Sequence, residues 1–149
     1  ENNITFADNR ANHSAVEEAA IISDVHDNIT EFSEGYETVL GERGVTVSGG
    51  QKQRISIARA IIKDAPILIL VDTNTEKKIL DNLRRTRKGK TTLLIAHRVT
   101  AVEQMDKVVF INDGKIAAVG THDELYNTNN AYHTMVELQR LDEEKEDKQ

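Results

Sequence analysis

The segment from Val47 to Arg54 is the part of this sequence best suited to bind a phosphate group. It reads VSGGQKQR, and a helical pattern of apolar residues follows it directly. Two glycines remove the side chains that would keep a phosphate away from the backbone, and Ser48 can cap the helix and offer a hydroxyl. The start of a helix adds free amides and the positive end of the helix dipole. Taken alone, Ser-Gly-Gly reads more simply as a flexible link, because Gly and Ser are common turn residues.

A histidine is the second candidate for chemistry. His97 follows the strand predicted for Thr91 to Ala96, and parallel sheets bind ligands at the carboxyl ends of their strands. Its imidazole has a useful titration range, although a lone His after an apolar strand is ordinarily structural. The other histidines lack metal-ligand spacing, so no metal site is predicted. They are His13, His26, His122 and His133.

A phosphate-gripping loop of the pattern G-x-x-x-x-G-K-[ST] is missing from the sequence. That loop wraps the β and γ phosphates of a nucleotide with successive amides and a Lys. Gly89-Lys90-Thr91 imitates its last three residues, but Arg84 stands where the first glycine belongs. The segment also lies between a predicted helix and a predicted strand in the reverse order. We therefore interpret Gly89 as a helix-ending glycine.

Predicted helices and strands alternate along the chain and position these residues. The predicted helices, from apolar residues at helical spacing, are Asn12–Val25 (capped by Asn12 or Ser14), Gln51–Ile62, Thr73–Arg87, Val99–Glu103, Thr121–Tyr126 and Tyr132–Leu141. The predicted strands are Pro66–Val71, Thr91–Ala96, Lys107–Asn112 and Lys115–Val119, the last two joined by a tight turn at Asp113-Gly114. This alternation indicates an α/β fold with a largely parallel sheet. A packing stripe is predicted on the last helix, at Tyr132, Met135, Leu138 and Leu141.

Composition excludes several classes of function. The chain has 149 residues, 38% hydrophobic and 30% charged, which suits one ordinary domain. Its formal net charge of -6 argues against a broad nucleic-acid surface. There is no Cys for a disulfide or thiolate site. No apolar run approaches the roughly 18 residues of a membrane helix, so we expect the chain itself to be soluble.

The longer segment Val47 to Ile62, VSGGQKQRISIARAII, resembles the signature motif and following helix of ABC ATPases. Thr38 to Gly44 looks like the exporter loop that touches the coupling helices of the membrane domain. Thr92 to Arg98, TLLIAHR, is similar to the strand and switch histidine, and Gly114 to Leu125 to the C-terminal hairpin and helix. The resemblance covers nearly the whole chain. It implies a partial P-loop NTPase-like ABC ATPase domain, with a mostly parallel sheet and an α-helical signature subdomain.

One segment departs from the family pattern. In the family, a strand like Ile67 to Val71 ends in an Asp that holds Mg²⁺ through water, followed by an acidic base and a loop that ends in a second Asp. Here Val71 to Glu76 is similar to the end of that loop, which favours a deletion and makes Asp72 the D-loop Asp. The alternative makes Asp72 the metal (Walker B) Asp, with Thr73 in the place of the base. Either alignment lacks a general base, and Glu76 suits the first turn of a helix.

The resemblance implies roles for individual residues. Val47, Ser48, Gly49, Gly50 and Gln51 would contact ATP that is held by a second nucleotide-binding domain, in a homodimer or a heterodimer. His97 would be the switch histidine, Asp72 would face the nucleotide, and Thr38 to Gly44 would meet the transmembrane domains. The intact parent would use ATP and Mg²⁺, with no nucleic acid as partner. We expect that this chain alone binds neither ATP nor Mg²⁺ tightly. We also expect that it does not hydrolyse ATP.

The parent would power export across a membrane from its cytoplasmic face, as multidrug and lipid exporters do. The predicted division is a helical subdomain fragment with the signature (1–62), a partial sheet core with the switch histidine (63–126), and a C-terminal helix with a charged tail (127–149). Glu1 to Phe6 reads like mid-domain sequence, so we expect a missing half and apolar sheet faces left exposed. Two alternatives stay open: a non-catalytic remnant that docks on a transporter, and a fragment of a soluble ABC ATPase.

Overall fold

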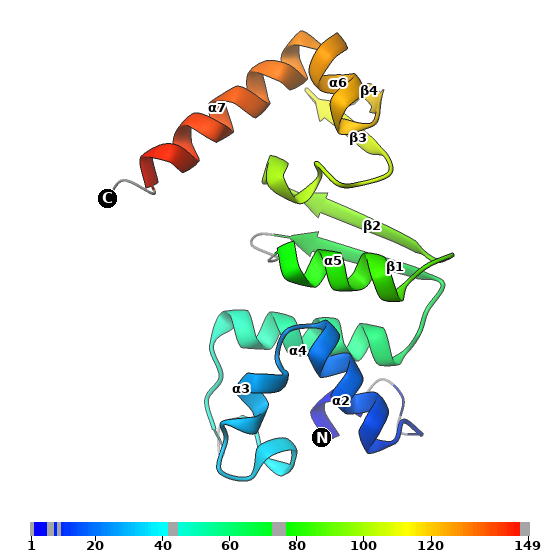
Figure 1. Cartoon of the computed structure of the whole chain (residues 1–149), viewed down its shortest axis with the longest axis vertical. Helices are drawn as coiled ribbons and strands as arrows, with labels where there is room; N and C mark the ends of the chain where they lie inside the picture. Colours follow the sequence, from blue (N-terminus) through cyan, green and yellow to red (C-terminus); the bar gives the residue numbers. More distant parts are fainter. Residues whose placement is uncertain (1, 6–7, 9, 42–44, 73–76, 147–149) are drawn as a thin grey trace. The chain divides into compact units, whose positions relative to one another are not determined.

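Helices and two small sheets make up the part of the chain that the computed structural model describes, which is residues 2–5, 8, 10–41, 45–72 and 77–146 (Figure 1). The chain divides into two compact units. One contains residues 1–69 and 78–93, and the other contains residues 70–77 and 94–149.

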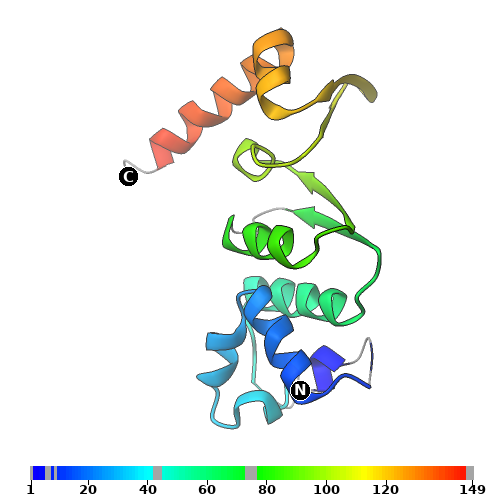
Figure 2. The ribbon, with the colours of Figure 1, turned by 45° about the vertical axis from the view of Figure 1, so that its right-hand side comes forward.

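The first unit begins with a group of helices around one apolar cluster. These are α1 (Asn2–Thr5), α2 (His13–Ile22), α3 (His26–Thr30), the 3-10 helix η1 (Gly35–Glu37) and α4 (Gly49–Ile62). Helix α2 packs against α4 and crosses it (Figure 2). Apolar residues from α1 to α4 meet in the cluster, whose buried members are Ile4, Val16, Ala19, Ala20, Val25, Ile29, Ile55 and Ala58. The helices predicted near residues 12–25 and 51–62 are thus confirmed, with shorter bounds for α2.

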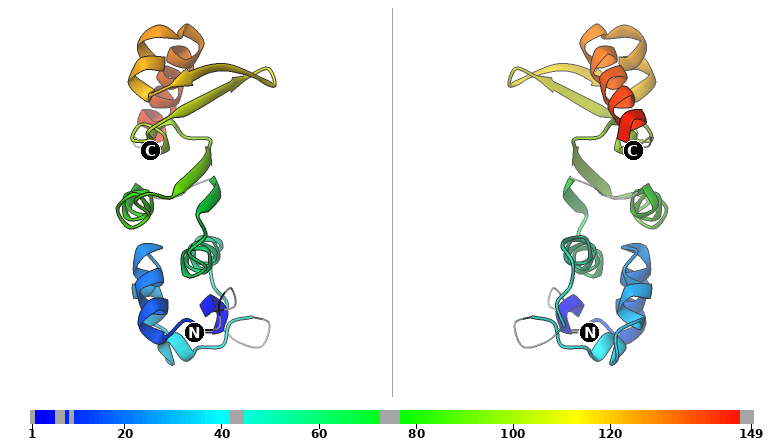
Figure 3. Two further views of the ribbon diagram at one scale, coloured as in Figure 1. Left: turned by 90° about the vertical axis from the view of Figure 1, so that its right-hand side faces the viewer. Right: turned by 90° about the vertical axis from the view of Figure 1, so that its left-hand side faces the viewer.

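Strand β1 (Ile67–Asp72), helix α5 (Lys77–Thr86) and strand β2 (Thr91–Ala96) come next along the chain. The two strands are neighbours in one sheet, run in the same direction, and have α5 on one side (Figures 1 and 3). Side chains alternate between the faces of a strand, and alternate residues of β1 are exposed. The exposed apolar residues of this sheet are Ile67, Ile69, Val71, Leu93 and Ile95, each with 48–67% of its surface accessible. One face of the sheet is therefore bare, as expected from the sequence.

The turn between α5 and β2 contains Gly89, whose φ of +77° lies in the left-handed region. Glycine adopts this conformation without steric cost, which supports its interpretation as a residue that ends the helical segment. The neighbouring Lys90 ammonium forms an ion pair with the Asp64 carboxylate. Gly89 and Lys90 thus have a local structural role.

The second unit contains the remaining strands and helices. Strands β3 (Val108–Asn112) and β4 (Lys115–Gly120) form an antiparallel hairpin, and Asp113 and Gly114 both have positive φ in its turn. This confirms the predicted hairpin, because a type I′ turn needs two such residues. The 3-10 helix η2 (Val99–Ala101), α6 (His122–Thr128) and α7 (Asn130–Glu146) complete the unit. Its buried cluster consists of Val99, Val108, Leu125, Tyr132 and Val136.

The stripe predicted on the last helix is only half correct. Tyr132 is buried at 1% exposure and Met135 packs against the cluster, whereas Leu138 and Leu141 are 58% and 52% exposed. Helix α7 extends past the cluster. Leu138 and Leu141 therefore keep the helical spacing of the stripe but lie beyond the cluster.

Candidate functional site

Helix α4 begins with a complete capping box. Ser48 has extended backbone angles, its hydroxyl oxygen accepts a hydrogen bond from the Gln51 amide (3.2 Å), and its own amide donates to Gln51 Oε1 (2.9 Å). This reciprocal pair fixes the first turn of the helix. Val47 is buried at 8% exposure and anchors the chain just before the cap. The predicted signature residues therefore lie together on one rigid turn.

Gly49 and Gly50 are the first two residues of α4, and the fold itself does not require glycine there. Neither has a positive φ, so an L-amino acid could adopt their backbone conformation. A Cβ atom built on either residue meets no atom within 4 Å. Glycine in a helix costs about 1 kcal/mol relative to alanine. The two glycines therefore leave the end of the helix open toward the outside without any benefit to packing.

The electrostatics of this turn suit an anion. The first amides of an α-helix have no partner within the helix, and of the first three here the Gln51 amide is taken by Ser48. Among the described residues, no hydrogen bond uses the amides of Gly49 and Gly50. The first turn of α4 also contains no acidic residue. Its positive end is thus available to an oxyanion.

The two arginines of α4 hold the helix within its unit. Arg54 Nη1 donates to the Asp24 carbonyl oxygen (3.1 Å), and Arg59 Nη2 donates to Asn3 Oδ1 (2.9 Å). These contacts indicate that both guanidinium groups hold the helix in place, rather than bind a phosphate. The phosphate-binding character of this site therefore comes from backbone amides and the cap.

Asp72 and His97 stand at neighbouring strand ends. Asp72 is the last residue of β1, and His97 directly follows β2, with both strands ending at the same edge of the sheet. Residues Thr73 to Glu76, which decide between the two alignments of this segment, lie outside the described residues. The structure thus brings Asp72 and His97 to one edge, and the roles of both stay predictions.

The turn that carries His97 is clamped by the last helix. Gln139 Nε2 of α7 donates to the His97 carbonyl oxygen (2.8 Å), and the Val99 amide donates to Gln139 Oε1 (2.8 Å). One amide side chain therefore fixes the backbone on both sides of Arg98, while the His97 side chain is exposed. Sequence reasoning did not find Gln139, because no local pattern links residues that are 42 positions apart.

The loop expected to meet a membrane domain is described from Thr38 to Gly41, while residues 42–44 lie outside the described part. The Val45 amide donates to the Val39 carbonyl oxygen (2.9 Å), which closes the loop. Val39 at the loop is 66% exposed. A single exposed apolar side chain is ordinary on a protein surface, so the contact of this loop with a membrane domain stays a prediction.

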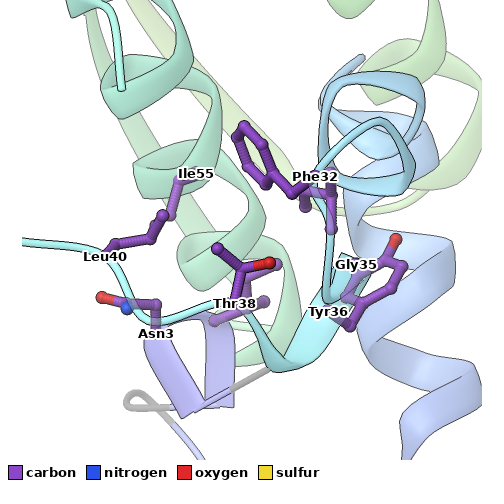
Figure 4. Close-up of a pocket in the computed structure, with 9 residues that line it drawn as sticks. Asn3, Phe32, Gly35, Tyr36, Thr38, Leu40 and Ile55 are labelled. Carbon is purple, nitrogen blue, oxygen red and sulfur yellow. The ribbon is translucent and has the colours of Figure 1, made fainter. Parts of the chain in front are cut away.

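A pocket lies beside this loop (Figure 4). It is small, with a cavity volume of about 20 Å³, and is lined by Asn3, Ile4, Ile29, Phe32, Gly35, Tyr36, Thr38, Leu40 and Ile55. Within the described part of the chain, the buried Thr38 hydroxyl has no hydrogen-bond partner. Burial raises the pKa of Tyr36 to about 12, with a further contribution from the Glu17 charge. The pocket is thus a small, mainly apolar hollow with a few neutral polar groups, and its volume suits a water molecule rather than a larger ligand.

The other histidines pack against tyrosines. His26 Nδ1 and the Tyr36 hydroxyl are 2.9 Å apart, and His122 Nδ1 and the Tyr132 hydroxyl are also 2.9 Å apart. His13 lies edge-on to Tyr36, and His133 stacks on Tyr126. In the described residues there is no group of three or more His, Asp or Glu that could hold a metal ion. None of the helices in this part of the chain combines the length and the apolar character that crossing a membrane requires.

Comparison with known proteins agrees with this geometry. Residues 1–75, which include the α4 cap and Asp72, match the family described as ABC transporter. A solved structure of a bacterial Atm1-family ABC exporter with ATP bound is 35% identical, with a TM-score of 0.82 over 93% of this chain and 25% of that chain. The fold is therefore the α/β fold of an ABC ATPase domain, in partial form, as predicted.

Curated relatives point to the same family. The ABC multidrug transporter atrD of Emericella nidulans is 46% identical over 137 residues, which cover 88% of this chain and 10% of that protein. The ATP-dependent lipid A-core flippase of Alkalilimnicola ehrlichii is 41% identical over 145 residues, covering 93% of this chain and 25% of the relative. The chain belongs to the ABC transporter family. It spans a tenth to a quarter of the length of these relatives.

Proposed function

We propose that this chain supplies the signature half of an ATP site that is completed by a second nucleotide-binding domain of an ABC exporter. The observation that carries the proposal is the first turn of α4, where two glycines serve neither backbone conformation nor packing. Two residues of low helix propensity in one turn, with no role in the fold, favour a function outside the chain. Clearance for a phosphate group is a reason that also explains the free amides.

In this proposal the chain's own residues act as positioned donors. The Gly49 and Gly50 amides and the Ser48 hydroxyl would meet the terminal phosphate, while Val47 and Gln51 hold the turn in place. Donors that are preorganised toward an oxyanion need no rearrangement during reaction and are worth several kcal/mol. The capping box provides this preorganisation.

The partner domain would bind the nucleotide phosphates through its own phosphate loop. The sequence contains no phosphate loop, and no acidic residue directly follows Asp72. ATP would bring its Mg²⁺, whose role is to neutralise phosphate charge, and Asp72 would face the nucleotide from the end of β1. His97 would contribute as the switch histidine, with its backbone held by Gln139. By itself the chain would neither bind ATP tightly nor hydrolyse it.

The parent would be an exporter whose nucleotide-binding domains lie at the cytoplasmic face of a membrane. The loop at Thr38–Gly41 and the adjacent pocket would receive the transmembrane domains, since both present apolar surface next to polar groups. The relatives that are multidrug transporters and lipid A-core flippases support export as the activity.

Calorimetric titration of the isolated chain with Mg-ATP tests the part of the proposal that concerns gripping. We expect no binding in the micromolar range. A micromolar Kd, or ATP hydrolysis that persists through repurification, would show that the chain has a complete site of its own.

A mixed assembly of this chain with a domain that has a complete phosphate loop tests the signature. Gly49→Asp places a carboxylate against the phosphate, so we expect ATP turnover to fall by about 100-fold or more. ATP affinity of the partner should change little, because its own loop is untouched. Unchanged turnover would favour the alternative of a remnant that docks on a transporter without facing a nucleotide, for which the pocket at Thr38 is the supporting observation.

A further inference from the structure

Three helices meet at a single carboxylate in the first unit. Asp24 lies in the turn between α2 and α3, and its side chain is only 17% exposed. Its carboxylate forms an ion pair with the Lys78 ammonium of α5 and lies 3.7 Å from Arg54 Nη1 of α4. Its carbonyl oxygen also accepts a hydrogen bond from Arg54 (3.1 Å). Asp24 therefore connects the turn after α2 with both α4 and α5.

The backbone of this turn is held firmly. The Val25 amide donates to the Ala20 carbonyl oxygen and the Asp24 amide donates to the Ile21 carbonyl oxygen, the two bonds of a Schellman motif. Asp24 has a φ of +56°, a position where glycine is usual. Asp is among the few other residues that tolerate it. An Asp here has a carboxylate that a glycine would lack, at a point fixed by the backbone.

A second contact brings α5 to the same place. Asn82, one helical turn after Lys78, donates to the Ile22 carbonyl oxygen at the end of α2 (3.2 Å). The carboxyl end of a helix carries partial negative charge, which favours nearby cations. Lys78 and Arg54 thus approach both a carboxylate and a helix end that attract positive charge.

One of the helices joined in this way, α4, carries candidate nucleotide-facing residues in its first turn, and the other, α5, follows Asp72 in the chain. Helix α4 begins at Gly49, directly after its Ser48 cap, and Arg54 lies about 8 Å further along its axis. Helix α5 is the next described element after Asp72. We propose that Asp24 is a positioning residue, which sets the signature helix α4 relative to α5. The catalytic consequence of this link rests on the proposed function, whereas the link itself does not.

The chain contains a matched control for this residue. Asp64 also follows the end of a helix, has a left-handed φ of +48°, and pairs with a lysine, Lys90. Unlike Asp24, its side chain is 72% exposed, and its carboxylate is not bonded to a second helix in the described residues. Asp64→Asn therefore makes the same chemical change at the same kind of turn without breaking the proposed link.

Hydrogen exchange on the full chain measures the link directly. Asp24→Asn keeps a residue that tolerates positive φ but removes the charge. We expect amide exchange to rise by about tenfold in two segments, 49–55 and 78–86, and to stay unchanged in the hairpin at 108–120. Asp64→Asn should affect only residues close to 64 and 90. A change confined to the neighbours of Asp24, or an equal rise in the hairpin, would overturn the proposal.

A double-mutant cycle and a kinetic measurement complete the test. Asp24→Asn and Lys78→Met should be non-additive in their effect on exchange, since each removes the same ion pair. Additive effects would contradict the link. In the mixed assembly, Asp24→Asn should lower ATP turnover by about tenfold while ATP affinity stays the same. If Gly49→Asp abolishes turnover and Asp24→Asn leaves it unchanged, the positioning role fails although the proposed function stands. If Gly49→Asp has no effect, the proposed function fails and exchange alone decides on Asp24.

Discussion

Helices α4 and α6 begin with the same pair of hydrogen bonds but carry different residues in their first turns. In α4 the Ser48 hydroxyl accepts from the Gln51 amide at 3.2 Å and Gln51 accepts from the Ser48 amide at 2.9 Å. In α6 the Thr121 hydroxyl accepts from the Glu124 amide at 3.2 Å and Glu124 accepts from the Thr121 amide at 2.9 Å. The cap itself therefore does not separate a structural helix start from a binding one.

The first turn makes the difference. In α6 it contains two acids that favour the helix dipole, one of them Asp123, and His122, which is buried and bonded to Tyr132. In α4 it contains Gly49 and Gly50 and no acid. The α6 turn satisfies its charge and packing within the chain. The α4 turn has neither an acid to neutralise the helix dipole nor a side chain that packs within the chain. The absence of these two stabilising features therefore indicates a ligand site at a helix start.

Giving α6 the glycines of α4 should have the largest effect on stability. His122→Gly together with Asp123→Gly should lower the free energy of unfolding by about 3 kcal/mol, through two helix glycines and one lost buried hydrogen bond. Urea unfolding followed by circular dichroism measures this loss. Asp123→Gly alone serves as the control and should cost about 1 kcal/mol. If the double variant costs no more than that, the His122–Tyr132 contact does not stabilise α6.

Replacing the glycines of α4 should change the free energy of unfolding in the opposite direction and by a smaller amount. Gly49→Ala with Gly50→Ala should raise the free energy of unfolding by about 1–2 kcal/mol, because the helix gains propensity and the added methyl groups enter open space. The same urea titration applies. A loss of stability would mean that the fold needs these glycines, and the comparison between the two helix starts would no longer point to a ligand.

The smallest effect concerns the tyrosines. Burial raises the pKa of Tyr36 to about 12 and also raises the pKa of Tyr132, and a hydrogen bond to Glu137 raises that of Tyr126. The ordinary pKa is about 10. For Tyr36, the stability that the folded chain gains from the neutral hydroxyl is present below about pH 10 and is lost as the pH rises through about 12. For Tyr126 and Tyr132 the loss likewise begins above about pH 10.

Ultraviolet absorbance of tyrosinate checks this expectation. The native chain should ionise at higher pH than the same chain in urea, where about half of the tyrosines are ionised at pH 10. If the titration curves of the native chain and of the chain in urea overlap, the tyrosine hydroxyls are as accessible in the folded chain as in the unfolded one. The tyrosines of the two His–Tyr pairs would then ionise like exposed side chains.

Local features of this fold were predictable because each depends on neighbouring residues. Asn12, Ser48 and Thr121 have side chains that cap helices, and each is observed at a helix start. Asp113-Gly114 meets the backbone demands of a tight hairpin turn. The glycines at the start of α4 were recognised in the same way, from residue type and spacing alone.

The missed features depend on residues far apart in the chain. The contact of Gln139 with His97 and the ion pair of Asp24 with Lys78 join segments that have no common local pattern. The exposure of Leu138 likewise depends on where the packed cluster ends, which helical spacing does not encode. Such contacts arise only when the chain folds, so that a single sequence carries little sign of them.

Because Gln139 bonds to the backbone at His97 and Val99, the position of Gln139 along α7 determines whether this turn is held. Each residue of a helix rotates the next by about 100°, so a single insertion between Asn130 and Gln139 would turn the amide group away from the backbone it holds. Substitutions of other residues on the exposed side of α7 would leave these two hydrogen bonds intact. The number of residues in this stretch is therefore as important to the turn at His97 as the identity of Gln139 and of the buried Tyr132 and Val136.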